Sequence, residues 1–88
     1  MTVTVRLPTQ LREYANGQAT VELDGTTVGE ILTNLGHAHP GVGRRVTDEQ
    51  GRIRRHVHVY IGEDRARTTD DTVPPNAEIT IMPAVSGG

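Results

Sequence analysis

The stretch that decides the fold covers residues 79–88 and reads Ile79-Thr80-Ile81-Met82-Pro83-Ala84-Val85-Ser86-Gly87-Gly88. The two isoleucines alternate with Thr80 and Met82, which is the period-two pattern of a strand with one buried face. Pro83 ends this strand because proline has no N–H to donate to a sheet. The sequence therefore predicts a last strand that runs directly into a tail.

The tail is long enough to reach into another protein. At about 3.3 Å per extended residue, the residues after Pro83 can carry the terminal carboxylate roughly 17 Å from the domain. Gly87 and Gly88 have no Cβ, so this end of the chain is thin enough for a narrow channel. A frayed terminus is the alternative, because small residues are common at disordered chain ends. The dipeptide alone leaves both interpretations open.

The composition limits the possible classes of protein. With 88 residues the chain forms one small domain, whose core must come from Val, Ile and Leu because Phe and Trp are absent. The absence of Cys excludes a disulfide framework, a thiolate zinc site and a cysteine nucleophile. No segment approaches the ~20 apolar residues of a membrane span, and the first residues lack the apolar run of a signal peptide. We therefore expect a cytoplasmic protein that does not contact a membrane.

The charge is unevenly distributed along the chain. All nine basic residues are arginine, and seven of them lie within residues 44–67, where they could meet phosphate or an acidic partner. The same span holds four acidic residues, and Tyr60 is its only aromatic residue able to stack on a base. We therefore expect a mixed, solvated surface and no nucleic-acid binding.

The first part of the chain contains two strand patterns and one helix pattern. Apolar alternation predicts strands over 3–7 and 18–23 that form a hairpin, joined by a connection over 9–17 in which Leu11 and Tyr14 are anchors. A helix follows, and its apolar stripe is spaced i, i+3, i+4 and i+7 at Val28, Ile31, Leu32 and Leu35.

The ends of that helix have their own signals. Thr27 and Glu30 have the spacing of a capping box, in which the hydroxyl and the carboxylate accept the first free N–H groups. Gly36 is the expected residue just after the helix, where glycine is favoured.

The second part of the chain completes the predicted sheet. A turn at 40–43 leads into a short helical piece that carries Val42 and Val46, and a polar loop follows at 48–51. Alternation predicts a strand over 57–61 and a brief edge strand over 65–67. Strand, strand, helix, strand, short strand, strand is the order of an α+β domain whose one main helix covers one face of the sheet.

The strand phase predicts a docking face. If Val5, Val57 and Ile81 face the helix, the opposite face carries Arg6, His58, Tyr60, Thr80 and Met82, with Pro8 at its end. Apolar side chains grouped on an open sheet face can mark an interface, so Pro8, His58, Tyr60 and Met82 are candidates for partner docking. Scattered apolar groups on an ordinary surface are the alternative.

Metal and catalytic patterns are weak. His37 and His39, and His56 and His58, form two His-x-His pairs, but neither has supporting Cys or carboxylate ligands, so we expect solvent-facing histidines and no metal. Ser86 is the only serine, and no nucleophile motif is present. We expect no catalytic residues in this chain.

The final strand and residues 82–88 resemble the ThiS/MoaD family of ubiquitin-like sulfur carriers, whose members end in Pro-x-Val-Ala-Gly-Gly or similar. The Pro-Ala-Val-x-Gly-Gly ending is closest to the CysO-like carriers of actinobacteria. Further matching segments run along the chain at 2–12, 27–30, 40–42, 57–60 and 71–72. The chain departs from the family pattern at Asn76-Ala77, where Gly-Asp is usual, at His58, which replaces a common Asn, and at Ser86, which replaces Ala.

The resemblance implies a β-grasp (ubiquitin-like) fold, with a mixed sheet of four to five strands and one main helix on one face. Residues 1–82 would form the domain and residues 83–88 a flexible tail. A terminal carboxyl with a pKa of about 3.5 is an anion at neutral pH and resists nucleophiles, so it needs activation. In the family, an E1-like enzyme adenylates the last glycine, here Gly88, and a sulfur donor then displaces AMP to leave a thiocarboxylate. Tail recognition would involve Gly87, Ser86, Val85 and Pro83.

The resemblance also implies partners. These are an E1-like adenylating or sulfurtransferase enzyme, a sulfur-accepting synthase for cysteine or another small molecule, and a desampylase-like metalloprotease. ATP would be used by the adenylating enzyme, and this chain would bind no cofactor. It would be a protein co-substrate and not an enzyme. The alternatives are a molybdopterin synthase small subunit, a thiamin thiazole sulfur carrier, a ubiquitin-like protein modifier, and a plain binding module.

Overall fold

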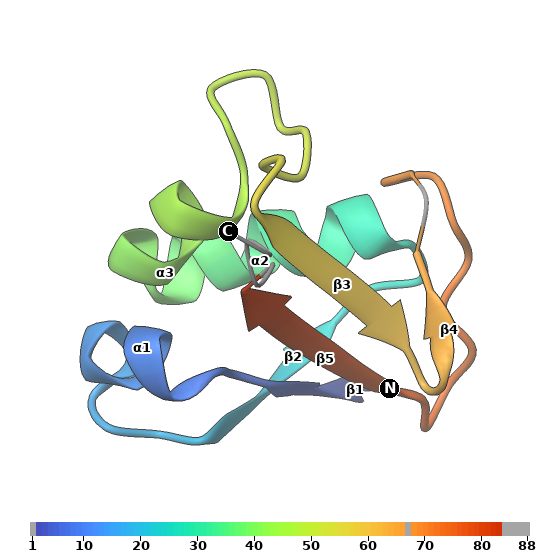
Figure 1. The fold of residues 1–88 in the computed structure, drawn as a ribbon. Helices are drawn as coiled ribbons and strands as arrows, with labels where there is room; N and C mark the ends of the chain where they lie inside the picture. Colours follow the sequence, from blue (N-terminus) through green and yellow to red (C-terminus); the bar gives the residue numbers. More distant parts are fainter. Residues whose placement is uncertain (1, 67, 84–88) are drawn as a thin grey trace.

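The computed structural model describes residues 2–66 and 68–83. It contains a five-stranded sheet in the order β2-β1-β5-β3-β4, with the helices on one face (Figure 1). The elements are β1 (Thr2–Arg6), α1 (Thr9–Arg12), the 3₁₀ helix η1 (Glu13–Ala15), β2 (Thr20–Asp24), α2 (Val28–Ala38), α3 (Pro40–Val46), β3 (Val57–Ile61), β4 (Asp64–Arg65) and β5 (Glu78–Pro83). The predicted α+β arrangement with a β-grasp sheet is confirmed.

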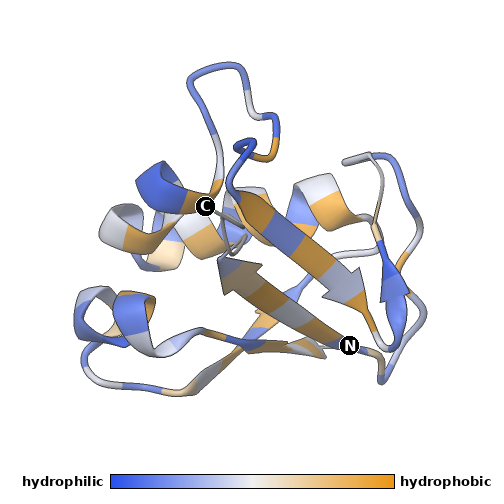
Figure 2. Ribbon diagram, viewed as in Figure 1, coloured by the Kyte–Doolittle hydropathy of each residue, from blue (hydrophilic) through white to orange (hydrophobic). Residues whose placement is uncertain are grey.

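The last strand occupies the middle of the sheet. β5 pairs in parallel with β1 and antiparallel with β3, while β1–β2 and β3–β4 are antiparallel hairpin pairs. The register places Ile79 beside Val5 on one side and Ile61 on the other, so apolar residues of three strands share one face. Figure 2 shows the resulting alternation of hydrophobic and hydrophilic residues along β3.

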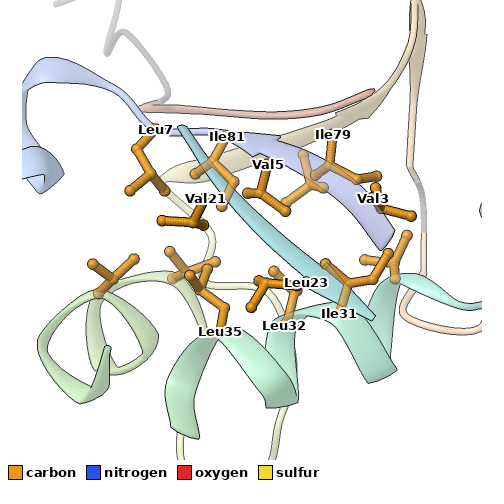
Figure 3. Packing of buried hydrophobic residues seen from close by; sticks show 14 of the residues in the cluster. Val3, Val5, Leu7, Val21, Leu23, Ile31, Leu32, Leu35, Ile79 and Ile81 are labelled. Atoms are coloured by element: carbon orange, nitrogen blue, oxygen red, sulfur yellow. The ribbon is translucent and has the colours of Figure 1, made fainter. Parts of the chain in front are cut away.

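The core lies between this face and α2. Val5 and Ile79 from the sheet and Ile31 and Leu35 from the helix are completely buried, and Figure 3 shows the two sets pointing toward each other. All large core side chains are aliphatic, which agrees with the lack of Phe and Trp. Burying each such side chain stabilises the folded state by about 1.5–3 kcal/mol, and this free energy keeps the helix packed against the sheet.

The start of α2 follows the predicted capping box with one difference. The Thr27 hydroxyl accepts the Glu30 N–H at 3.2 Å, as expected of an N-cap. The Glu30 carboxylate, however, accepts both the hydroxyl and the N–H of Thr26, each at 2.7 Å, which is one residue earlier than predicted. These bonds, the hydroxyl first, hold the pKa of Glu30 below its ordinary value, because they favour the ionised form.

The predicted end of α2 at Gly36 is wrong. The helix continues to Ala38 and stops before Pro40, which begins α3. Gly36 lies instead where the two helices cross: a Cβ placed on Gly43 would be 2.5 Å from the Gly36 Cα. The glycines thus allow a close approach between helices, and the helical piece carrying the fully buried Val42 and Val46 is confirmed.

Three other details differ from the predictions. The connection over 9–17 is mostly helical, because it forms α1 and η1. The second strand begins at Thr20 and leaves out Gln18 and Ala19, although the Ala19 carbonyl still accepts the Leu7 N–H at 2.8 Å. The edge strand begins at Asp64, one residue early, and Arg67 lies outside the described residues.

None of the helices within residues 2–66 and 68–83 is long and apolar enough to cross a membrane.

Candidate docking face and tail root

The predicted docking residues on β3 and β5 share the open face of the sheet. His58 lies directly opposite Met82 in the antiparallel register, and Tyr60 lies opposite Thr80. Met82 is 48% exposed, while His58 and Tyr60 are half-buried. The strand phase inferred from the sequence is therefore confirmed, and we refer to His58, Tyr60, Thr80 and Met82 as the open face.

The part of the sheet beside the open face is polar. Arg6 of β1 lies opposite Thr80 and forms an ion pair with Glu78 at 3.4 Å, in which both side chains are exposed. An exposed pair of this kind contributes about 0–1 kcal/mol to folding stability. Its main effect is to make this part of the surface polar. Met82 thus stands out as the exposed apolar side chain of this face among the described residues.

Pro83, the first residue of the predicted tail, directly follows Met82 of the open face. Pro83 is the last residue of β5 and sits opposite Val57 of β3. The predicted site residues Gly88, Gly87, Ser86 and Val85 lie outside the described residues.

A hollow of about 330 Å³ borders Pro83, and we call it the tail-root hollow. Its lining is formed by Pro8, Gln10, Leu11, Tyr14, Arg45, His56, Val57, Ile81, Met82 and Pro83. The predicted site residue Pro8 therefore lines the hollow together with Met82, which joins the hollow to the open face.

Seven lining residues of the tail-root hollow were not predicted as site residues, and three of these have an aromatic or basic side chain. Tyr14 comes from η1, Arg45 from α3, and His56 from the segment just before β3. The Arg45 guanidinium stacks on the Tyr14 ring, 3.7 Å from its centroid. The cation at the tail root is therefore held in place by an aromatic ring.

The two His-x-His pairs do not converge. His56 lines the tail-root hollow, His58 is paired with Met82 on the sheet, and His37 and His39 lie at the end of α2. Within the part of the chain that the structure describes, there is no group of three or more His, Cys, Asp or Glu residues that could hold a metal ion.

Comparison with known proteins identifies relatives over nearly the whole chain. A model of the ThiS family matches residues 5–88. The sulfur carrier protein CysO of Mycobacterium tuberculosis is 33% identical, with all of both chains covered. Small archaeal modifier protein 1 of Haloferax volcanii is also 33% identical, covering 94% of this chain and 97% of the relative.

Solved structures agree with this assignment. The crystal structure of the Amycolatopsis orientalis BexX/CysO complex matches with a TM-score of 0.87 and 34% identity, covering 98% of this chain and 99% of the other. The crystal structure of SAMP1 from Haloferax volcanii matches with a TM-score of 0.85 and 31% identity over the full length of both chains. These relatives are small carriers and modifiers with a ubiquitin-like β-grasp fold, and the carriers among them are not catalysts. The chain described here belongs to the ThiS family.

Proposed function

We propose that this chain is a sulfur carrier whose C-terminal Gly88 is activated by an E1-like adenylating enzyme and converted to a thiocarboxylate. The thiocarboxylate then donates sulfur for the biosynthesis of cysteine or another sulfur-containing small molecule. Family membership and the likeness to CysO support this function. The observation that carries it is the position of β5, whose last residue Pro83 adjoins both the exposed Met82 and the tail-root hollow.

The proposed chemistry needs no reactive side chain in the carrier. A carboxylate oxygen of Gly88 attacks the α-phosphorus of ATP, and pyrophosphate leaves. Sulfide from a donor then attacks the carbonyl carbon of the acyl-adenylate, the C–O bond to AMP breaks, and AMP departs with its electrons. The sulfur is held by a backbone carbonyl, which fits a chain that contains no cysteine.

The carrier would dock through the open face and the residues beside it. Pro8, His58, Tyr60 and Met82 would contact the enzyme, while Pro83, Val85, Ser86 and Gly87 would lie along its channel. Tyr and Met are among the residues enriched at protein interfaces, and Met adapts its shape to irregular partners. A sulfur-accepting synthase would use the same surface after the enzyme has released the charged carrier.

The function is tested by intact-mass measurement of the full chain after incubation with ATP, a sulfide source and the adenylating enzyme from the same organism. We expect the mass gain of one oxygen replaced by sulfur, located at Gly88 by fragmentation. Deletion of Gly88 should abolish the gain while the thermal unfolding curve stays unchanged. Thiolation of a chain that carries extra residues after Gly88, without their removal, would refute the mechanism.

The docking face is tested separately. Replacing Tyr60 and Met82 together by Glu should raise the KM of the adenylating enzyme for the carrier at least tenfold. Thr20→Glu is the control, because Thr20 is exposed in the edge strand β2 and pairs with Arg6 on the same face, away from β3. Equal KM values for the double variant and the wild type would remove the open face from the proposal.

A ubiquitin-like protein modifier is the second candidate function. It is favoured by the 33% identity to small archaeal modifier protein 1. As a modifier, the chain would be joined through Gly88 to lysine side chains of other proteins. Covalent conjugates in a cell extract with ATP, and no mass gain from sulfur, would support this function over the first.

A further inference from the structure

We infer that the tail-root hollow binds a segment of the activating enzyme that presents an apolar side chain followed by a carboxylate. This inference rests on the proposed function and adds a specific contact to it. Pro83 lines the hollow, so a partner that draws the residues after Pro83 into its channel would bring the rim of that channel against the hollow.

The charge of the hollow is one-sided. Arg45 and His56 line it, and none of its lining residues is acidic. The two ion pairs found within the described residues are Arg6–Glu78 and Arg52–Asp48, and neither involves Arg45. The cationic side chain at the tail root therefore has no carboxylate partner in that part of the chain, which favours an acidic group from outside.

Contacts within the protein fix the Arg45 side chain before any carboxylate binds. Its Nη1 donates to the Gly41 carbonyl at 2.9 Å, one turn earlier in α3, while its guanidinium plane covers the Tyr14 ring. Tyr14 also packs closely on the backbone of Gly41, because a Cβ on Gly41 would lie only 3.1 Å from the Tyr14 Cβ. Gly41, Tyr14 and Arg45 thus form a packed unit, and little side-chain freedom is lost when a carboxylate binds.

The floor of the hollow is apolar. The floor consists of three largely buried side chains, Leu11, Val57 and Ile81. The rim is apolar but exposed and is formed by Met82 and Pro83. A volume of about 330 Å³ is at the lower end of typical small-ligand pockets, so it suits one or two side chains of a partner. An apolar side chain on the floor with a carboxylate at Arg45 satisfies both parts of the surface.

The first test reverses one charge at two adjacent positions. Arg44 and Arg45 are both exposed in the last turn of α3, but Arg44 lines a different hollow beside Thr47 and Arg54. With an enzyme that thiolates the wild type, Arg45→Glu should raise the KM for the carrier at least tenfold with kcat nearly unchanged. Arg44→Glu, which changes the net charge equally, should raise it less than twofold. Equal effects of the two variants would overturn the inference.

The second test does not depend on sulfur chemistry. The full chain, labelled with ¹⁵N, is titrated with a blocked synthetic peptide of alternating Leu and Glu, and with the same peptide carrying Gln in place of Glu. We expect the Glu peptide alone to shift the amide signals of Tyr14, Arg45 and Met82, and Arg45→Glu to abolish these shifts. Equal shifts with the Gln peptide, or shifts elsewhere, would overturn carboxylate recognition.

The two tests separate the two proposals. If no adenylating enzyme thiolates the wild type, the proposed function fails, and the titration still decides whether the hollow recognises an apolar side chain followed by a carboxylate. If thiolation succeeds and Arg45→Glu behaves as Arg44→Glu does, the inference fails and the sulfur carrier stands.

Discussion

Replacing Gly43 by Ala tests how closely α3 packs against α2. The new Cβ would lie 2.5 Å from the Gly36 Cα. The helices must separate by about 1 Å to restore a carbon–carbon distance near 3.5 Å. Overpacking of this kind costs roughly 1–3 kcal/mol, and the higher helix propensity of Ala offsets about 1 kcal/mol of it. We expect a net loss of about 0–2 kcal/mol in the free energy of unfolding, by combining these two effects.

Gly36→Ala is the matched control from the other side of the same contact. A Cβ on Gly36 would meet the Gly43 Cα at 3.8 Å, which is an ordinary contact, so only the propensity effect remains. This variant should gain up to about 1 kcal/mol. Urea denaturation with linear extrapolation measures both, and a difference of about 2 kcal/mol corresponds to a shift in Tm of roughly 8–16 °C. Equal stabilisation by both substitutions would show that the helices are not packed as described.

Three further predictions concern the helix start, acid stability and the lysine-free surface. Thr27→Ala should lower the free energy of unfolding by about 1 kcal/mol through loss of the N-cap. Urea denaturation measures this loss. Thr33→Ala, on the exposed side of the same helix, is the control and should change the free energy of unfolding little. Because the pKa of Glu30 is lowered in the folded state, its stabilising effect is present above its ordinary value of 4.5 and is lost as the pH falls below it. The stability difference between wild type and Glu30→Gln should therefore shrink between pH 6 and pH 3, and a constant difference would refute this assignment. Arg44→Lys would give the chain its only lysine, and gel electrophoresis after activation should show no covalent carrier dimers if the chain is a sulfur carrier.

Patterns with a short period were readable in the sequence. The alternation in residues 57–61 and 79–82 predicts which side chains share a face, because each strand residue points opposite to its neighbour. Registers and burial agree, with His58 opposite Met82 on the open side and Val59 and Ile81 buried beneath. The stripe of α2 was equally clear, since four apolar residues at helical spacing are rarely accidental.

Contacts between segments that lie far apart in the sequence could not be predicted from it. α1 has four residues and one buried side chain, Leu11, which is too little for a periodic signal. The sequence predicted a helix end at Gly36 because the close contact that explains this glycine is with Gly43, which lies on another helix. The tail-root hollow unites Tyr14, Arg45 and His56 from separate elements. The only local hint was Gly41 four residues before Arg45, a spacing that places both on one side of a helix.

The central position of β5 has a mechanical consequence. Without β5, the strands would be two separate hairpins, β1–β2 and β3–β4, with no ladder between them, because β5 is the neighbour that both share. A pull along β5, applied beyond Pro83, is therefore opposed by two rows of backbone hydrogen bonds. Each row runs along the direction of the force, and the bonds in it cross to the neighbouring strand. Both rows must shear together, whereas an edge strand pulled in the same direction would shear only one row. A partner that pulled on the end of this chain would thus have to break both ladders before the domain unravelled.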